Sequence, residues 1–274
     1  MQEVIKLSGK IFDLIKKKKP LTMGILNVTP DSFSDGGKYF QIEDAINHAK
    51  KLINQGVDII DVGGESTRPD AELVSEEEEL RRVIPVIKKL SSLISHFSPH
   101  VLISIDTYKS NVAKRALEAG VNIINDVSGL TMDLEMVNVA RDANCGIVIM
   151  HNKEIPATKP REKSFPPLTF HLLPQCLNDV YTWLKKQTNF ALENSVSPQN
   201  IIIDPGIGFG KTPEEDLYLI EHLYEFKSLG FPILVGSSRK SFIRKLFGEE
   251  NFEVKNKEMI ELAIKNGASI IRLH

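Results

Sequence analysis

The feature that most constrains the fold is a regular alternation of short apolar runs with stretches of helical periodicity along almost the whole chain. The apolar runs are rich in Ile and Val and have the length of strands. They lie at residues 21–27, 57–63, 101–105, 121–124, 147–150, 201–203, 232–235 and 268–273. Runs as uniformly apolar as these favour a parallel sheet that is buried on both faces.

Helical stretches separate these strands, at residues 42–55, 75–90, 110–119, 134–143 and 172–194, with two more that begin near Thr212 and Arg239. Ser75 and Glu78 form a capping-box pattern, and Thr212 precedes a proline at a first helical position. We interpret the acidic run 76–79 as a solvated helix start. Eight strand–helix units in about 250 residues predict an α/β protein, a TIM (β/α)8 barrel rather than a doubly wound sheet.

The chain of 274 residues has no linker or low-complexity tract, which predicts a single domain over residues 1–274. Residues 1–19 are expected to form an N-terminal β-hairpin, from strands 4–7 and 11–14, followed by a turn. Residues 20–274 then form the barrel. Because the eighth strand ends with the chain, we expect the barrel to lack its final helix. The seam between the eighth and first strands would then expose apolar surface.

Composition narrows the function classes. Lys and Arg total 34 and Asp and Glu 36, a formal net charge of −2, which argues against a nucleic-acid-binding surface. Two cysteines are too few for a disulfide framework. No apolar stretch is long enough to span a membrane, and no secretory signal is present at the start. We expect a cytoplasmic protein whose partners are small molecules, not nucleic acids or membranes.

Polar side chains follow nearly every predicted strand, and in a closed barrel these strand ends converge on one mouth. They are Asn27, Glu65, Asp106, Asn125, Asp126, His151, Asp204, Ser237, Ser238, Arg272 and His274. Carboxylates and amides suit a planar heterocycle with N–H donors, whereas Arg68, Lys240, Arg272 and His274 suit an anion such as phosphate. The glycine-rich segment 206–211 matches neither phosphate-binding fingerprint, and no His-Glu-x-x-His pair is present. The pattern indicates a small-molecule enzyme without naming its reaction.

Two long motifs supply the name of a family. Residues 23–37 (MGILNVTPDSFSDGG) and 61–69 (DVGGESTRP) resemble the two N-terminal signatures of the dihydropteroate synthases. Shorter matches follow in the family's order, at residues 105–109 (IDTYK), 124–127 (INDV), 204–211 (DPGIGFGK), 238–240 (SRK) and 271–274 (IRLH). The resemblance implies a TIM barrel that joins 4-aminobenzoate to 6-hydroxymethyl-7,8-dihydropterin diphosphate and releases diphosphate. Sulfonamides target this class of enzyme.

The resemblance also implies roles for individual residues. Asp204 would accept hydrogen bonds from the pterin amino and ring N–H groups, Asn125 and Asp106 would bind the remaining ring edge, and Lys240 would donate to the ring. Met150, Phe209 and Gly236 complete this substrate-binding set. The catalytic group would comprise Asp35, Arg68, Asp106 and Lys240, with carboxylates facing a cationic transition state.

The diphosphate end of the site is implied in the same way. Asn27 would bind Mg²⁺, while Arg272 and His274 would hold the diphosphate with Arg68 close by. Phe33, Thr67, Pro69 and Ser241 would shape the aminobenzoate pocket.

Several of these residues could instead have structural roles. Asp106 and Asp204 could cap helices, Asn125 could bond a neighbouring loop, Arg239 could form a structural ion pair, and Asp126 is interpreted as support for the site. Two other functions remain open: a pterin-dependent methyltransferase, and a pterin-binding pseudoenzyme or truncated barrel without turnover. Charged residues in 252–261, where relatives have small ones, leave homodimerisation open. Asp70 and the segment 152–156 also depart from the family pattern.

Overall fold

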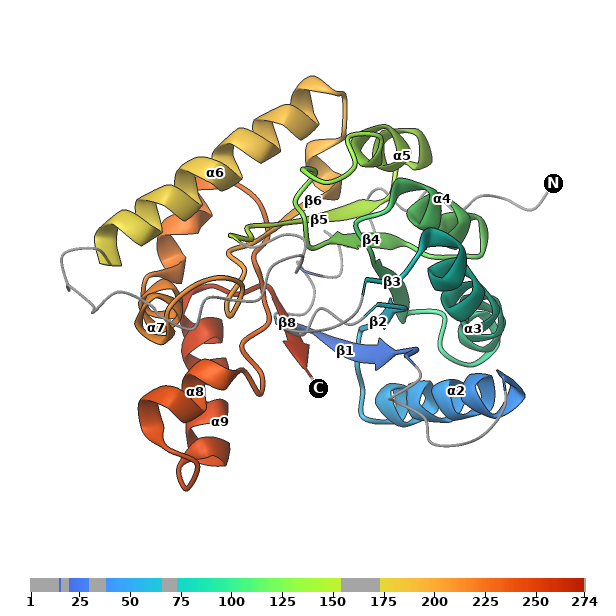
Figure 1. Cartoon of the computed structure of the whole chain (residues 1–274), viewed down its shortest axis with the longest axis horizontal. Helices are drawn as coiled ribbons and strands as arrows, with labels where there is room; N and C mark the ends of the chain where they lie inside the picture. The colour runs from blue at the N-terminus through green and yellow to red at the C-terminus, as the bar shows by residue number, and fades with distance from the viewer. Residues whose placement is uncertain (1–14, 16–19, 30–37, 66–72, 154–172, 274) are drawn as a thin grey trace.

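The computed structural model describes residue 15 and residues 20–29, 38–65, 73–153 and 173–273, and these form a barrel of parallel strands (Figure 1). The strands are hydrogen-bonded in the order β6-β5-β4-β3-β2-β1-β8-β7. Their bounds are β1 Leu21–Asn27, β2 Ile59–Gly63, β3 Leu102–Asp106, β4 Ile123–Asp126, β5 Gly146–Met150, β6 Ile201–Asp204, β7 Leu234–Val235 and β8 Ile270–Leu273. A parallel bridge between Ile203 and Ile233 joins the two ends of this order, so the ring is nearly closed. The predicted TIM barrel is confirmed.

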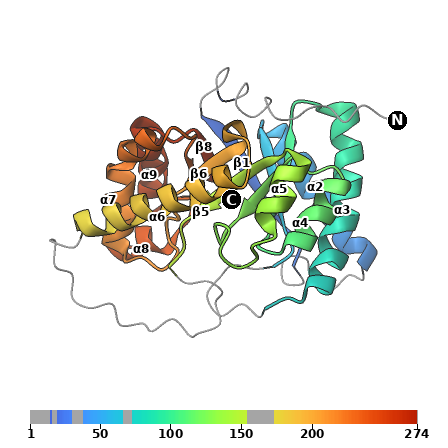
Figure 2. The same cartoon turned by 90° about the horizontal axis from the view of Figure 1, so that it is seen from above.

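Helices surround the strands, with α2 to α5 on one side and α6 to α9 on the other (Figures 1 and 2). Their bounds are α2 Lys38–Asn54, α3 Glu76–Phe97, α4 Ser110–Glu118, α5 Met136–Ala143, α6 Leu173–Glu193, α7 Pro213–Glu221, α8 Ser241–Phe247 and α9 Phe252–Asn266. Short 3-10 helices lie at Pro198–Asn200 and Leu223–Leu229. None of the helices in these described ranges is long and apolar enough to cross a membrane.

Two predicted helices differ from those in the structure. The helix after Ser75 was expected to end near residue 90, but it continues to Phe97 because its apolar face continues and buries Ile94. The helix expected from Arg239 is two helices, α8 and α9. Arg239 itself has a positive φ of 55° and lies before α8, and Gly248 ends α8. Thr212 and Glu215 form the expected capping box at α7.

The barrel interior is built in layers, because successive strand side chains alternate between the two faces of the sheet. The floor is an apolar cluster of Ile15, Leu21, Met23, Ile59, Leu102, Ile123, Val148, Ile202, Leu234 and Ile270. The residues two positions further along the strands also face inward, and they are Ile25, Asp61, Ser104, Asn125, Met150, Asp204, Gly236 and Arg272. One more step brings Asn27, Gly63 and Asp106 inward. The apolar floor and the polar mouth therefore both follow from the two-residue alternation of side chains along the strands.

The sequence predicts an N-terminal hairpin at one end of the chain and a missing final helix at the other. The predicted N-terminal hairpin over residues 1–19 lies outside the described residues, apart from Ile15, whose side chain is buried in the barrel floor. At the other end, β8 stops at Leu273, one residue before the last residue of the chain, so no helix follows it within this sequence.

Candidate active site

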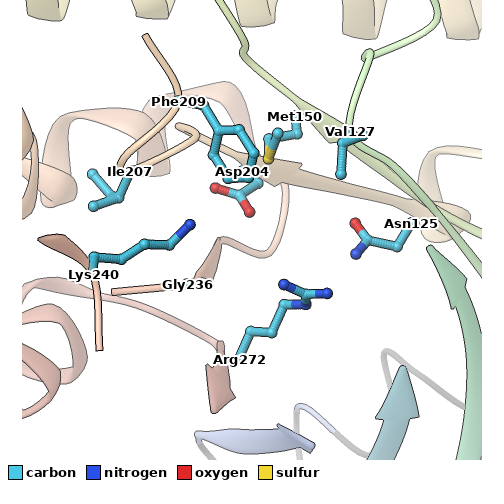
Figure 3. A pocket seen from close by; sticks show the side chains of 9 residues that line it. All are labelled: Asn125, Val127, Met150, Asp204, Ile207, Phe209, Gly236, Lys240 and Arg272. Carbon is cyan, nitrogen blue, oxygen red and sulfur yellow. The ribbon is translucent and has the colours of Figure 1, made fainter. Parts of the chain in front are cut away.

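A pocket opens at the carboxyl ends of the strands, where the layer of polar residues lies above the apolar floor (Figure 3). Its lining residues are Asn125, Val127, Met150, Asp204, Ile207, Phe209, Gly236, Lys240 and Arg272. They come from four strands and from the segments that follow β4, β6 and β7. The pocket combines apolar walls with two cations and with carboxylate and amide groups, as a site for a polar ring would.

Asp204, the last residue of β6, is held by the backbone around it. Its Oδ1 accepts a hydrogen bond from the Gly206 N–H at 2.7 Å, and its carbonyl accepts one from the His151 N–H at 2.9 Å. The carboxylate points into the pocket (Figure 3). Gly206 has a φ of +69°, and a Cβ there would lie 1.8 Å from the His151 carbonyl oxygen, so only glycine permits this turn.

Lys240 faces Asp204 across the pocket, and the glycine-rich segment determines its position. The Lys240 Nζ lies 4.2 Å from the centroid of the Phe209 ring, a cation–π contact. A Cβ on Gly208 would lie 3.0 Å from the Lys240 Cδ, so the glycine leaves room for the lysine stem. Burial lowers the pKa of Lys240 to about 8. The amine is therefore largely cationic near neutral pH, although burial disfavours its charge.

Arg272 on β8 is bound between two carboxylates. Its Nε donates to Asp61 Oδ2 at 2.8 Å, and its Nη2 donates to Asp106 Oδ2 at 2.7 Å. The same Asp61 oxygen accepts a hydrogen bond from Asn125 Nδ2 at 3.0 Å. Burial raises the pKa of Asp106 to about 7, opposed chiefly by Arg272, and burial raises the pKa of Asp204 to about 6. Residues from β2, β3, β4 and β8 thus form one buried network.

The glycine-rich segment is also supported from below. Lys211 is buried, and its Nζ donates to the Gly206 carbonyl at 2.7 Å. Asp216 at the start of α7 accepts a hydrogen bond from the Gly208 N–H at 2.7 Å. Burial lowers the pKa of Lys211 to about 8 and raises that of Asp216 to about 6. Neither residue lines the pocket.

A second buried cluster lies where the segment 66–72 leaves and rejoins the described structure. The Lys109 Nζ donates to Glu65 Oε2 and Glu79 Oε2, each at 2.5 Å, and to the Val74 carbonyl at 2.8 Å. Tyr108 donates its hydroxyl to Glu65 Oε1 at 2.9 Å. Glu79 is only 1% exposed, so our interpretation of the whole run 76–79 as solvated is wrong for this residue. Burial raises the pKa of Glu79, and Lys109 opposes the rise.

Comparison with known proteins identifies the family of the chain. The sequence profile described as "Pterin binding enzyme" matches residues 23–274. The chain belongs to this family of pterin-binding enzymes. The dihydropteroate synthase of Bacillus subtilis is 45% identical to it over 261 residues, which is 94% of this chain and 84% of that protein.

Two solved structures of this family are similar along most of the chain. The dihydropteroate synthase from Clostridium difficile, determined in the presence of pteroic acid, superposes with a TM-score of 0.81 at 41% identity and covers 94% of this chain and 91% of its own. The dihydropteroate synthase from Anaplasma phagocytophilum, with bound 6-hydroxymethylpterin-monophosphate, gives a TM-score of 0.82 at 36% identity and covers 94% of each chain.

The pocket brings together most of the predicted pterin-facing residues that the structure describes. Asn125, Met150, Asp204, Phe209, Gly236, Lys240 and Arg272 all line it. Asp106 is 8% exposed and joins through Arg272. Neither Asp106 nor Asp204 is a helix cap, since each is the last residue of a strand. The ligand roles predicted for these residues remain predictions.

Other predicted residues lie elsewhere. Asn27 ends β1, half-buried, and Ser241 begins α8 with its side chain exposed. Arg239 forms an exposed ion pair with Glu253, which agrees with the alternative that it has a structural role. Asp126 is buried and accepts hydrogen bonds from the Ser128 and Leu130 N–H groups, which braces the turn after β4. Predicted residues outside the described part of the chain are Phe33, Asp35, Thr67, Arg68, Pro69, Asp70 and His274.

Sequence reasoning missed several participants. Val127 and Ile207 line the pocket as apolar walls. Asp61, Lys109 and Glu79 have buried polar contacts that were not predicted. Asp61 and Lys109 lie inside the family motifs, but no role was assigned to them. The signal that could have found Asp61 is the strand period, because a carboxylate two residues after the inward-facing Ile59 must also face inward.

Proposed function

We propose that this chain is a dihydropteroate synthase, a transferase that joins 4-aminobenzoate to 6-hydroxymethyl-7,8-dihydropterin diphosphate. A bond forms between the arylamine nitrogen and the pterin methylene carbon. The bond from that carbon to the diphosphate oxygen breaks, and the amine loses a proton. The observation that carries the proposal is the pocket at the barrel mouth, in a chain that is 45% identical to the Bacillus subtilis synthase over 94% of its length. The products are 7,8-dihydropteroate and diphosphate.

The pterin ring would lie in the pocket with its amino and ring N–H groups toward Asp204 and Asn125. A carboxylate that accepts two N–H bonds gives strong, orientation-specific recognition. Phe209, Met150 and Val127 offer apolar surface to the ring, and Lys240 would donate to its oxygen and nitrogen edge. The pterin phosphate bound to the Anaplasma phagocytophilum relative supports a pterin as the ligand class.

Expulsion of diphosphate leaves positive charge delocalised into the pterin ring. Asp106 lies on the mouth side of the inward layer, where its carboxylate would stabilise this charge together with Asp35. Arg68 would instead stabilise negative charge on the leaving group. Preorganised charges of this kind supply much of the rate in many enzymes. Because an arylamine is already a nucleophile, positioning would supply much of the remainder.

The diphosphate would contact Arg272 and His274. Arg272 already donates one N–H from Nε and one from Nη2 to carboxylates, so Nη1 and the second N–H of Nη2 are the donors that would meet an anion. A guanidinium held rigidly by two carboxylates presents its remaining donors in a fixed direction. Phe33, Thr67, Pro69 and Ser241 would form the aminobenzoate side of the site.

The residues at the end of β1 fit a hard divalent cation such as Mg²⁺. A Cβ on Gly63 would lie 3.6 Å from both Asn27 Oδ1 and the Asp106 Cβ, so the glycine leaves space beside an amide oxygen. Within the described ranges no three His, Cys, Asp or Glu residues form a cluster that could hold a metal. Asn27 would therefore hold Mg²⁺ together with diphosphate oxygens and water. When bound, the cation neutralises negative charge on the leaving group.

We expect a chelator to separate turnover from ring binding. With excess EDTA, diphosphate release should stop, because the leaving group loses its neutralising cation. The affinity for 6-hydroxymethylpterin, which has no diphosphate, should stay within about twofold, since its contacts involve no metal. Asn27→Ala should raise the Mg²⁺ concentration needed for half-maximal turnover, with Asn138→Ala on the outer helix α5 as a control. Turnover unaffected by EDTA would contradict the metal assignment.

The affinity for pterin should depend on pH through Asp204. Burial raises the pKa of Asp204 to about 6, and its proton must be absent for the carboxylate to accept two N–H bonds. As pH falls through about 6 the binding-competent fraction falls, so affinity should drop about tenfold per pH unit below it. Calorimetry from about pH 5 to 8 measures the pterin affinity at each pH. Asp204→Asn cannot titrate at this position, so its profile gives the contribution of the ligand's own titration, which is then subtracted. Superimposable pH profiles for the two proteins would remove Asp204 from the proposed contact.

Diphosphate release tests the proposed function and separates it from the open alternatives. The purified chain with Mg²⁺ should release diphosphate only when both the pterin diphosphate and 4-aminobenzoate are present. A pseudoenzyme would show thermal stabilisation by pterin without release. A methyltransferase would accept a methylated reduced pterin and ignore 4-aminobenzoate.

A further inference from the structure

Asp61 lies beneath the pocket and has contacts that the proposed roles do not use. It is the third residue of β2, its side chain is 0% exposed, and it faces the barrel interior. Its Oδ2 accepts hydrogen bonds from two residues that line the pocket, Asn125 and Arg272. With no accessible surface of its own, Asp61 can act on a ligand only through these neighbours.

The contact with Asn125 determines which end of the amide faces the ligand. A carboxylate is only an acceptor, so the atom of Asn125 that meets Asp61 Oδ2 at 3.0 Å must be the amide nitrogen. The amide oxygen then lies on the Asp204 side of the pocket, as Figure 3 shows. Asp204 and Asn125 therefore both present acceptor atoms. Two acceptors on neighbouring walls suit an exocyclic amino group, which has two N–H donors.

The cost of Asp61 argues that it is retained for more than stability. Its second oxygen, Oδ1, is buried without a hydrogen-bond partner among the described residues. An unsatisfied buried carboxylate oxygen is costly, and replacing a whole buried ion pair by apolar groups is often neutral or stabilising. Around the pocket the carboxylates of Asp61, Asp106 and Asp204 accompany the cations Lys240 and Arg272. Without the Asp61 charge, two carboxylates and two cations would remain around the pocket, so their charges would balance.

We propose that Asp61 is a positioning residue that makes Asn125 a hydrogen-bond acceptor, and that it thereby selects a ring with an amino group over one with a carbonyl at that place. The inference rests on the proposed function, because it concerns recognition of the pterin ring. Through its Nε contact, Asp61 also orients Arg272. When position 61 offers no acceptor atom, the amide of Asn125 is free to turn its nitrogen toward the ligand.

The test compares the full chain with Asp61→Leu, which has a similar shape but no acceptor, with Asp61→Ala and with Ser104→Ala. Ser104 is the register partner of Asp61 on β3, and its buried hydroxyl has no partner among the described residues, so it is a matched control. The ligands are 6-hydroxymethylpterin and 6-hydroxymethyllumazine, in which a carbonyl replaces the amino group. Calorimetry gives both affinities, steady-state kinetics gives the KM for 4-aminobenzoate, and thermal unfolding gives the Tm.

For Asp61→Leu we expect pterin affinity to fall at least about tenfold, which is the loss of about 1.4 kcal/mol. Its preference for pterin over lumazine should fall by a similar factor. The KM for 4-aminobenzoate at saturating pterin diphosphate should stay near the wild-type value, whereas the Tm should fall because Arg272 keeps only its contact with Asp106. Ser104→Ala should match wild type throughout. A merely structural residue would lower the Tm and leave the preference unchanged.

If Asp61→Leu does not fold, Asp61→Ala, which also has no acceptor, is judged by the same readouts. A folded variant with the wild-type preference for pterin over lumazine overturns the inference and leaves the proposed function intact. A wild-type chain that binds no pterin overturns both.

Discussion

Replacing Asp204 by Asn should reduce the affinity for 6-hydroxymethylpterin by at least about 100-fold. Each hydrogen bond to a charged group contributes about 1.5–3 kcal/mol, and two are expected between this carboxylate and the ring, so the loss is about 3 kcal/mol or more. The variant also turns an N–H donor toward the donors of the ligand. Its Oδ1 can still accept the Gly206 N–H bond, which keeps the turn after β6 intact. Isothermal titration calorimetry at neutral pH measures the change.

Asp216→Asn is the matched control for this measurement. Asp216 is buried like Asp204, accepts a hydrogen bond from the same glycine-rich segment, and has a pKa that burial likewise raises to about 6. It does not line the pocket, so its loss should lower stability but leave pterin affinity within about threefold. Equal losses of affinity in both variants would mean that the glycine-rich segment as a whole, and not the Asp204 carboxylate, determines binding.

Lys109→Met should lower the free energy of unfolding by about 3–5 kcal/mol, the range for a buried ion pair that loses one partner. The substitution keeps much of the side-chain volume but leaves the carboxylates of Glu65 and Glu79 without their shared cation. It also removes the donor to the Val74 carbonyl. Urea unfolding followed by circular dichroism gives the difference. Lys255→Met, which breaks a more exposed pair with Glu258 and a cation–π contact with Phe247, should cost about 1 kcal/mol.

The destabilisation by Lys109→Met should shrink as pH falls from 7 toward 4.5, the ordinary pKa of a glutamate. Burial raises the pKa of Glu79 in the folded chain, and loss of Lys109 raises it further. A carboxyl with a raised folded-state pKa costs stability above that pKa and regains it as protonation proceeds. A stability difference that is small at pH 7, or that grows in acid, would contradict the assigned pairing.

Much of the fold could be predicted from the sequence because the strand period and the helix signals agree. The buried strands, the Thr212 cap and the count of eight units each indicate the same barrel, and the polar residues at the strand ends correctly indicated its mouth. Boundaries were harder to predict where no local signal exists. Helix α3 passes residue 90 because of packing by Ile94, and α8 ends at Gly248 within a stretch that looks continuously helical.

Part of the pocket lining could be predicted from the sequence, but its internal hydrogen bonding could not. Asn125, Asp204, Lys240 and Arg272 were identified by strand position and motif. The sequence carries no sign that Arg272 would bridge Asp61 and Asp106, because those contacts join strands that are more than 160 residues apart. Lys109 was missed because its partners Glu65 and Glu79 are 44 and 30 residues away in sequence, after β2 and in α3. Glu79 in particular resembles its solvated neighbours in sequence alone.

The most direct test of the central claim is identification of the product. The purified chain is supplied with Mg²⁺, 6-hydroxymethyl-7,8-dihydropterin diphosphate and 4-aminobenzoate, and the reaction is analysed by mass spectrometry alongside a diphosphate assay. We predict 7,8-dihydropteroate and diphosphate in equal amounts, with a strongly reduced rate for Asp204→Asn. Diphosphate released without dihydropteroate, or no turnover from a folded chain that binds pterin, would contradict the assignment as a dihydropteroate synthase.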